Sequence, residues 1–133
     1  MGRERCAGAA VRVLLLAPTP MSLRHVALLT RDLAATERFY TEILGLERAF
    51  DHAGMLFLRT PGRLDLLNFI ATRRPFDPKA GGLDHFGVHV TPARWRGLRE
   101  RLRRAGVKVV GRRGRSALYV EDPNGYTVEI YRD

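Results

Sequence analysis

One pattern of strand, helix and glycine occurs twice in this chain of 133 residues, and it constrains the fold more than any other feature. In the first half, an apolar strand at 24–29 precedes a helix that begins after the capping residue Asp32 and ends at Gly45. In the second half, a strand at 84–90 precedes a helix from Pro92 to Gly106. Three short apolar stretches follow each helix, near 46–52, 54–60 and 63–70 and near 107–112, 115–121 and 125–132. The sequence therefore predicts an α+β fold of two βαβββ modules.

The two modules are expected to form a single domain at 21–133, because the chain is too short for two large cores. The modules cover about 21–72 and 83–133, and the linker at 73–82 contains two prolines and two glycines. Residues 1–20 carry a short apolar patch that an arginine interrupts and two prolines follow. We expect this segment to be a disordered extension rather than a signal peptide.

Four polar residues occupy matching positions in the two halves. His25 lies twenty residues before the helix-ending glycine of the first half, and His85 lies twenty-one residues before that of the second. Glu129 follows its glycine by twenty-three residues, and the same offset in the first half reaches Asn68. His25 therefore corresponds to His85 and Asn68 to Glu129, which places the four side chains at pseudo-equivalent points around one axis.

Three of these residues, His25, His85 and Glu129, form a donor set suited to a metal ion. Two imidazoles and a carboxylate from separate strands can hold one divalent metal and leave part of its coordination sphere open. An open position lets the metal polarise a substrate oxygen or activate a water. A carboxylate buried without a cation is costly, so metal binding is favoured over an ordinary role in the core.

The remaining acidic and histidine candidates are less suited to this site. Asp65 is three residues from Asn68, which places it on the opposite face of a strand and argues against a fourth ligand. We expect His89 to point to the opposite sheet face from His85 and to be a core residue. His52 lies at a strand end and is expected to face solvent.

The charge of the chain is strongly positive but not of a kind that predicts nucleic-acid binding. The formal charge is +9, and nearly all of it comes from arginine, because lysine occurs only at Lys79 and Lys108. The densest cluster, 94–115, covers a predicted helix with the following strand and loop. We interpret it as a solvated basic face, with an anion-attracting rim as the alternative.

Cysteine content and hydropathy bound the compartment. Cys6 is the only cysteine, so an intrachain disulfide is excluded and a reducing cytoplasm is expected. No apolar run reaches the ~18–20 residues that a membrane-spanning helix needs, so no membrane partner is expected.

Four segments resemble the vicinal oxygen chelate superfamily, which contains glyoxalase I, fosfomycin-resistance enzymes, extradiol dioxygenases and bleomycin-resistance proteins. The segments are Arg-His-Val-Ala-Leu-Leu at 24–29, Phe-Tyr-Thr-Glu-Ile-Leu-Gly-Leu at 39–46, Leu-Asp-His-Phe-Gly-Val at 83–88 and Asp-Pro-Asn-Gly-Tyr-Thr-Val-Glu-Ile at 122–130. The resemblance spans Met21 to Asp133 and implies a cupped, mixed β-sheet around a central site. It also implies a homodimer.

The resemblance assigns roles to particular residues. His25, His85 and Glu129 match three metal-ligand positions of the family, and the fourth position, an acid in glyoxalase I, falls on Asn68. A neutral amide is a weak ligand, so Asn68 is interpreted as a group that binds substrate or water. The remaining set of two histidines and one carboxylate favours the fosfomycin-resistance and extradiol branches. Tyr119, ten residues before Glu129, matches a substrate-contacting tyrosine of both branches and is the catalytic candidate.

Arg115 and Ser116, with the preceding glycine, resemble the loop that meets a phosphonate in the fosfomycin-resistance group, which makes them substrate-binding candidates. Ala27 replaces the threonine usual in those enzymes, and the histidine pair that the extradiol branch carries near 63–64 is missing. For Tyr119, the alternative is a strand aromatic that only packs against its neighbours.

The resemblance implies a metalloenzyme with one divalent ion, Mn, Fe, Zn or Ni, acting on a small oxygen-rich or anionic molecule. The reaction would be of lyase, thiol-transferase or dioxygenase type, and a thiol co-substrate is left open. The alternative is a metal-free protein that sequesters a drug-like ligand, as bleomycin-resistance proteins do. A third reading is a partner-binding domain that uses the basic face at 94–115.

Overall fold

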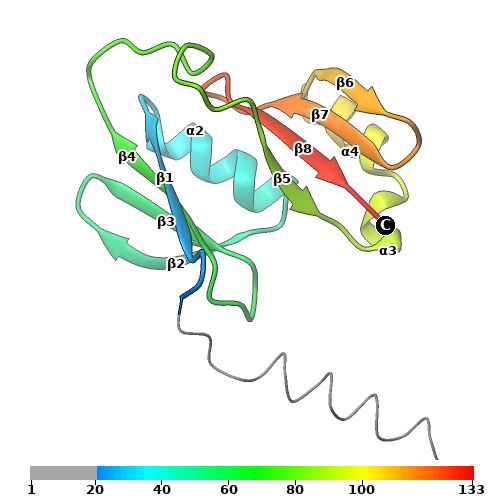
Figure 1. The fold of residues 1–133 in the computed structure, drawn as a ribbon, viewed down its shortest axis with the longest axis horizontal. Helices are drawn as coiled ribbons and strands as arrows, with labels where there is room; N and C mark the ends of the chain where they lie inside the picture. The colour runs from blue at the N-terminus through cyan, green and yellow to red at the C-terminus, as the bar shows by residue number, and fades with distance from the viewer. Residues whose placement is uncertain (1–20) are drawn as a thin grey trace, which may run out of the picture.

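Two four-stranded sheets stand side by side in the computed structural model, which describes residues 21–133 (Figure 1). Cys6 and the extension predicted at 1–20 lie outside the described residues. The first sheet has the strand order β1-β4-β3-β2, and the second has the order β5-β8-β7-β6. The strands of the first sheet are β1 (His25–Thr30), β2 (Glu47–His52), β3 (Met55–Arg59) and β4 (Leu66–Ala71). Those of the second are β5 (Phe86–His89), β6 (Val109–Arg113), β7 (Ala117–Glu121) and β8 (Thr127–Tyr131).

The two sheets have the same topology. In each, the first strand of the module pairs in parallel with its last strand, β1 with β4 and β5 with β8. All other pairings are antiparallel, and each outer hairpin carries an irregularity of register in its outer strand. A parallel pair requires a crossover, which the helical segment between β1 and the later strands supplies. The two predicted βαβββ modules are therefore confirmed.

The helical segment of the first module is a short α-helix followed by a wider turn. The helix α2 (Leu33–Arg38) begins at Asp32, whose side chain accepts a hydrogen bond from the backbone nitrogen of Ala35. The chain then continues as the π-helical turn η1 (Phe39–Ile43) before Gly45. The predicted extent of this helix is correct, but its second half has five-residue rather than four-residue hydrogen bonds.

The helical segment of the second module is broken, whereas a continuous helix was predicted. It consists of α3 (Pro92–Trp95) and α4 (Leu98–Arg104). Between them, Arg96 is extended and Gly97 has a φ of 73°, a conformation that side chains with a Cβ rarely adopt. The helix prediction was wrong at this point because the glycine was not weighed as a break. No helix within residues 21–133 is long and apolar enough to cross a membrane.

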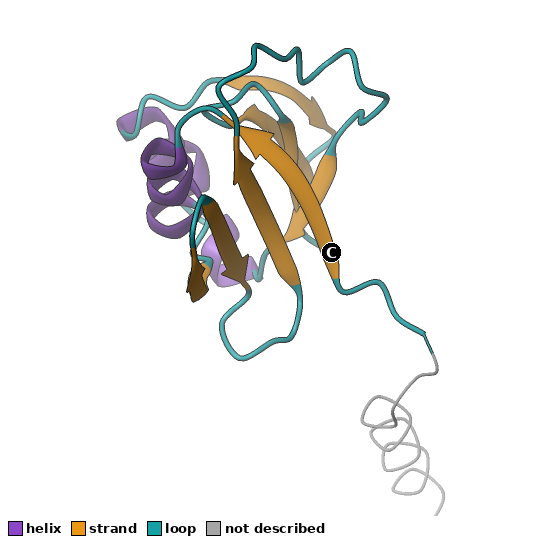
Figure 2. Cartoon of the chain, turned by 90° about the vertical axis from the view of Figure 1, so that its left-hand side faces the viewer, coloured by secondary structure: helices purple, strands orange, loops and turns teal. Residues whose placement is uncertain are grey.

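A single core joins the two modules. The helices lie on one side of the strands (Figure 2), and the α2–η1 segment lies against both sheets. The ring of Tyr40 lies 5.2 Å from that of Phe69 in β4 and 6.3 Å from that of Phe86 in β5. Because one buried aromatic residue contacts both sheets, the modules pack as one unit rather than as two independent cores.

Polar contacts also fix one module to the other. The hydroxyl of Tyr40 donates to Oδ2 of buried Asp122, at 2.7 Å. The hydroxyl of Tyr126 donates to the carbonyl of Leu29 at 2.9 Å and accepts from its backbone nitrogen at 3.1 Å. The turn at 122–126 of the second module is thereby attached to the helix and the first strand of the first module.

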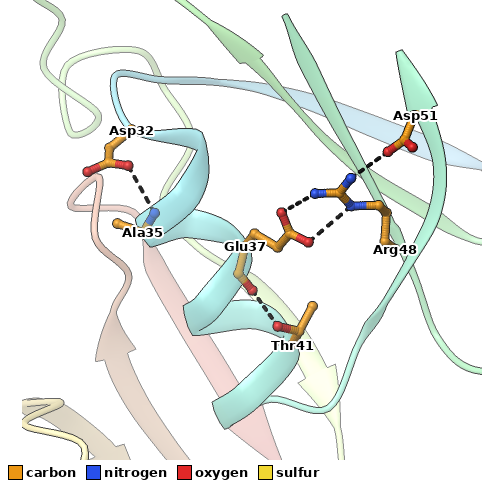
Figure 3. Close-up of polar contacts among 6 residues, drawn as sticks. All are labelled: Asp32, Ala35, Glu37, Thr41, Arg48 and Asp51. Carbon is orange, nitrogen blue, oxygen red and sulfur yellow. Dashed lines mark hydrogen bonds and ion pairs between the residues drawn. The ribbon is translucent and has the colours of Figure 1, made fainter. Parts of the chain in front are cut away.

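A surface ion-pair cluster ties α2 to the outer hairpin of the first sheet (Figure 3). The guanidinium of Arg48 in β2 donates to both carboxylate oxygens of Glu37 in α2 and to Asp51. Asp51 is largely exposed and Arg48 is half-exposed. Exposed pairs of this kind contribute little stability, so this cluster adds little to the packing of α2 against the hairpin.

Candidate functional site

Side-chain alternation divides each sheet into a core face and an opposite, open face. In β8, Val128 and Ile130 are fully buried in the core, so Glu129 between them points to the open face. In β4, Leu67 and Phe69 pack in the core, so Asn68 points to the open face of the first sheet.

The open faces carry two matching rows of directly paired residues. The first row crosses β1, β4, β3 and β2 with Ala27, Asn68, Phe57 and Phe50. The second row crosses β5, β8, β7 and β6 with Gly87, Glu129, Tyr119 and Gly111. The predicted correspondence of Asn68 with Glu129 is therefore a feature of the register.

Glu129 of the second row forms a compact polar pair with His85, which directly precedes β5. Nε2 of His85 is 3.2 Å from Oε2 of Glu129, and Nδ1 of the same ring is 2.6 Å from Oδ2 of Asp84. The hydrogen bond with Asp84, with a smaller contribution from Glu129, raises the pKa of His85. Asp84 is exposed, and its contact at Nδ1 leaves Nε2 facing Glu129, which is the geometry that outer-sphere carboxylates give metal-binding histidines.

Arg113 is the basic residue that reaches this pair, and the sequence analysis missed it. Its Nη2 donates to Oε1 of Glu129 at 2.7 Å, and this hydrogen bond lowers the pKa of Glu129. Arg115 and Ser116 lie beyond Arg113 in the β6–β7 turn, where the Ser116 hydroxyl makes only a long contact to the Arg113 carbonyl. Alternation from Gly111 would have identified Arg113 had the predicted strand not ended at 112.

Two tyrosines flank the pair. The ring of Tyr119 meets the ring of His85 edge-on, with centroids 5.4 Å apart. Tyr131 lies over Gly87, where an added Cβ would be 2.9 Å from its Cε1. At Gly111 the nearest atom of Tyr119 would be 3.5 Å away, an ordinary contact. The glycines therefore leave room for tyrosine rings to lie against the sheet on either side of Glu129.

The first-sheet residues of the predicted site lie apart from this pair. His25 is exposed and lines a cavity of about 670 Å³ between β1–β4 and β5–β8, whose lining residues do not include His85 or Glu129. Asn68 is 5% exposed, and its Oδ1 is buried without a hydrogen-bond partner. Across residues 21–133, no three His, Cys, Asp or Glu side chains converge closely enough to hold a metal.

The donor types of these residues suit a divalent ion, but the described part of one chain brings too few of them together. His85 and Glu129 are typical metal donors and already face each other on an open surface. Catalytic sites usually provide three protein ligands, and the described part of one chain brings together only two. A third donor must come from elsewhere for a stable site to form.

The structure also locates the residues that were set aside. His89 shares the open face with His85, which directly precedes β5, because the two are four residues apart along an extended segment. His89 is exposed, so its prediction as a core residue was wrong. Its Nε2 lies 3.2 Å from Oδ1 of Asp133, and its ring meets Tyr131 edge-on. Asp65 accepts a hydrogen bond from the backbone nitrogen of Thr60 and lies outside the pair.

Comparison with known families gives one match that covers most of the chain. The sequence model of the Glyoxalase/Bleomycin resistance protein/Dioxygenase superfamily matches residues 22–130. Among curated proteins, no sequence matches the chain.

Solved structures share the fold. An integron cassette protein from the mobile metagenome of the Halifax Harbour sewage outfall is 28% identical, with a TM-score of 0.68 over 84% of this chain and 98% of the other. A glyoxalase/dioxygenase from Nostoc punctiforme is 20% identical, with a TM-score of 0.72 over 88% and 96%. A lactoylglutathione lyase from Agrobacterium tumefaciens is 23% identical, with a TM-score of 0.63 over 86% and 96%.

Proposed function

Because the chain belongs to the Glyoxalase/Bleomycin resistance protein/Dioxygenase superfamily, we propose that it is a metalloenzyme acting on a small oxygen-rich or anionic molecule. The observation that carries the proposal is the contact between His85 and Glu129 on an open sheet face. Asp84 orients the imidazole, which is the arrangement that metal-binding histidines use.

His25 of a second copy is the third ligand in this proposal. Within one chain His25 stands apart from His85, yet it occupies the corresponding position of the first module. In the described part of the chain, β1 and β5 each have a strand partner on one side only. Proteins normally protect unpaired strand edges. The apolar side chains of Val26 and Leu29 in β1 are also 40% and 41% exposed. A homodimer that joins the first module of one copy to the second module of the other would cover these edges and complete the ligand set.

The chain's own residues would then bind and orient the substrate beside the ion. A bound Mn, Fe, Zn or Ni ion would supply polarisation of a substrate oxygen. Tyr119, whose ring touches His85, can donate its phenolic proton to an anionic oxygen. Arg113 next to the carboxylate, with Arg115 and Ser116 at the mouth of the turn, would attract the anionic part of the substrate.

The proposal covers three reaction types: a lyase reaction, a thiol-transferase reaction that requires a thiol co-substrate, and a dioxygenase reaction. The identity of the metal bound in cells would distinguish these reaction types, because ferrous iron suits oxygen chemistry and redox-inert zinc does not. We place the protein in the cytoplasm, since its sequence has one cysteine and no means of forming an intrachain disulfide.

A second candidate function is metal-free binding of a drug-like ligand. It is favoured by the cavity of about 670 Å³ between the modules, whose size suits a small molecule. Apolar residues of both sheets line it, together with Arg24, Arg59 and Arg63.

Metal content of the protein purified without chelator tests the first function. We expect about one divalent ion per chain, lost in His85→Ala and in Glu129→Gln, because each removes one of only three protein ligands. His52→Ala is the matched control, since it removes an imidazole outside the site, and it should retain the ion. If the wild type takes up none of the four ions at millimolar concentration, the metalloenzyme proposal fails.

A further inference from the structure

The first row carries an aromatic surface on its open face. Phe50 and Phe57 are direct cross-strand partners on β2 and β3, and their rings stack with centroids 4.3 Å apart. Phe50 is nevertheless 50% exposed, although it is a large apolar side chain within a strand. The ring of His52 meets Phe57 edge-on, with centroids 6.3 Å apart, and extends this aromatic surface along the hairpin.

A buried amide lies beside the aromatic pair. Asn68 is the direct partner of Phe57, and the buried Oδ1 of Asn68 has no hydrogen-bond partner. A buried oxygen without a hydrogen-bond partner is unfavourable, so the site gains when a ligand donor reaches it. Rotation about the terminal side-chain torsion of Asn68 turns this oxygen toward the open face. Ala27, the next residue in the row, leaves this side of the amide without a bulky neighbour.

The same row differs from its counterpart in the second sheet. Where the first row has Phe50, Phe57 and Asn68, the second has Gly111, Tyr119 and Glu129. One half of the pseudo-symmetric site is therefore ionic, and the other half is flat, aromatic and uncharged. Two halves that differ in this way suit a substrate with two chemically different ends.

We propose that Phe50, Phe57 and Asn68 bind a flat, unsaturated ring of the substrate, whose hydroxyl or N–H group donates to the Asn68 amide. The ring stacks on the exposed face of the phenylalanine pair, where an offset aromatic contact adds to the burial of apolar area. The anionic end of the substrate points to the His85–Glu129 half. This inference rests on the proposed function for the orientation of the substrate, but the ring-binding surface belongs to the first module alone.

Three probes of equal charge isolate the ring. They are 2-naphthoate, 6-hydroxy-2-naphthoate and the saturated decahydronaphthalene-2-carboxylate, each titrated into the full-length protein as purified and followed by calorimetry. We expect 2-naphthoate to bind about tenfold more tightly than its saturated analogue, since a difference of about 1.4 kcal/mol is within reach of a stacked ring. Equal affinities for the flat and the saturated probe would overturn the proposal.

Two variants and one control assign the preference to the row. Phe50→Ala removes an exposed ring and should abolish the preference for the flat probe. Asn68→Leu should abolish only the additional affinity of the hydroxylated probe over 2-naphthoate. Leu64→Ala is the control, because Leu64 is 70% exposed on a loop outside the row, and the preference should remain. If Leu64→Ala weakens the preference as much as Phe50→Ala does, binding is general adhesion to apolar surface and the proposal fails.

The oligomeric state and the metal content separate this inference from the proposed function. If Phe50→Ala changes the sedimentation of the protein, the exposed ring is covered by a second copy and the ring-binding proposal is wrong. His85→Ala should lose the metal and keep the preference for the flat probe. A wild type that binds metal but shows no such preference refutes only the ring-binding proposal. A wild type that prefers the flat probe but binds no metal refutes only the metalloenzyme proposal.

Discussion

At the scale of single residues, the ionisable groups of the second sheet are arranged around Glu129. Arg113 donates to one of its oxygens and His85 lies 3.2 Å from the other. The carboxylate is thus already paired with the guanidinium of Arg113. An incoming ion must share or replace the contact with Arg113, so this arginine sets how readily Glu129 becomes a ligand.

Arg113→Ala is therefore expected to strengthen metal binding. Arg113 is largely exposed whereas Glu129 is only 12% exposed, so solvent screens the pair from the arginine side and the affinity for Mn²⁺ or Zn²⁺ should rise only by about two- to fivefold. Calorimetric titration with each ion measures the change. Arg112→Ala is the matched control, because its side chain alternates to the other face of β6. A weaker affinity in Arg113→Ala would show that the arginine orients Glu129 rather than competing for it.

Asp122 gives a second prediction at this scale. Burial raises the pKa of Asp122, and hydrogen bonds from Tyr40 and Asn124 offset only part of this shift. A carboxyl whose folded-state pKa is raised contributes stability below its unfolded value of about 4, and this contribution is lost as the pH rises through the folded value. An asparagine in its place does not titrate. Its amide NH₂ would face the Tyr40 hydroxyl and the Asn124 amide, which both donate to Asp122.

Asp122→Asn should therefore cost about 1–3 kcal/mol of unfolding free energy. The cost should be larger at pH 4 than at pH 7, because only the wild type carries the Asp122 carboxyl, whose contribution to stability is lost as the pH rises. Urea unfolding of both proteins at the two pH values measures the difference. A cost that grows from pH 4 to pH 7 would mean that the hydrogen bonds outweigh burial and that the pKa of Asp122 is lowered.

At the scale of elements, close packing over Gly87 places Tyr131 beside Glu129. A Cβ at Gly87 would lie 2.9 Å from the Tyr131 ring, whereas one at Gly111 would make only an ordinary contact with Tyr119. Gly87→Ala should therefore displace Tyr131 and cost about 1–3 kcal/mol, and Gly111→Ala should change stability by about 0.5 kcal/mol or less. Thermal unfolding of the two variants gives the comparison, and equal effects would show that the Tyr131 ring moves aside freely.

The elements also show how far the sequence could predict this structure. Apolar periodicity and the glycines at 45 and 106 suffice for both βαβββ modules and for the match of Asn68 with Glu129. Gly97 was not sufficient by itself to show the helix break, because a glycine inside a helical pattern is often tolerated. His89 was misplaced through an error of alternation that a count of four residues would have corrected. How the two sheets face each other is set by the core around Tyr40, which no local pattern specifies.

At the scale of the whole molecule, pseudo-symmetry and an incomplete site lead to the same assembly. In the proposed site, each chain supplies one half-site with His25 and one with His85 and Glu129, and these residues do not converge within residues 21–133. In a two-fold dimer, the His25 half-site of each chain meets the His85–Glu129 half-site of the other, so two complete sites form. Both metal sites of such a dimer would contain residues of both chains.

Mixed dimers test this arrangement directly. In a dimer of His25→Ala with His85→Ala, one of the two sites receives both lesions and the other receives neither. Random pairing of equal amounts, by co-expression or by joint refolding, should give about one metal per four chains, although neither variant binds metal alone. His85→Ala mixed with Glu129→Gln is the matched control, since both lesions lie in the same half-site and every mixed site stays damaged. Recovery in the first mixture only would show that the site is shared between chains. No recovery in either mixture would show that His25 is not supplied by a second copy.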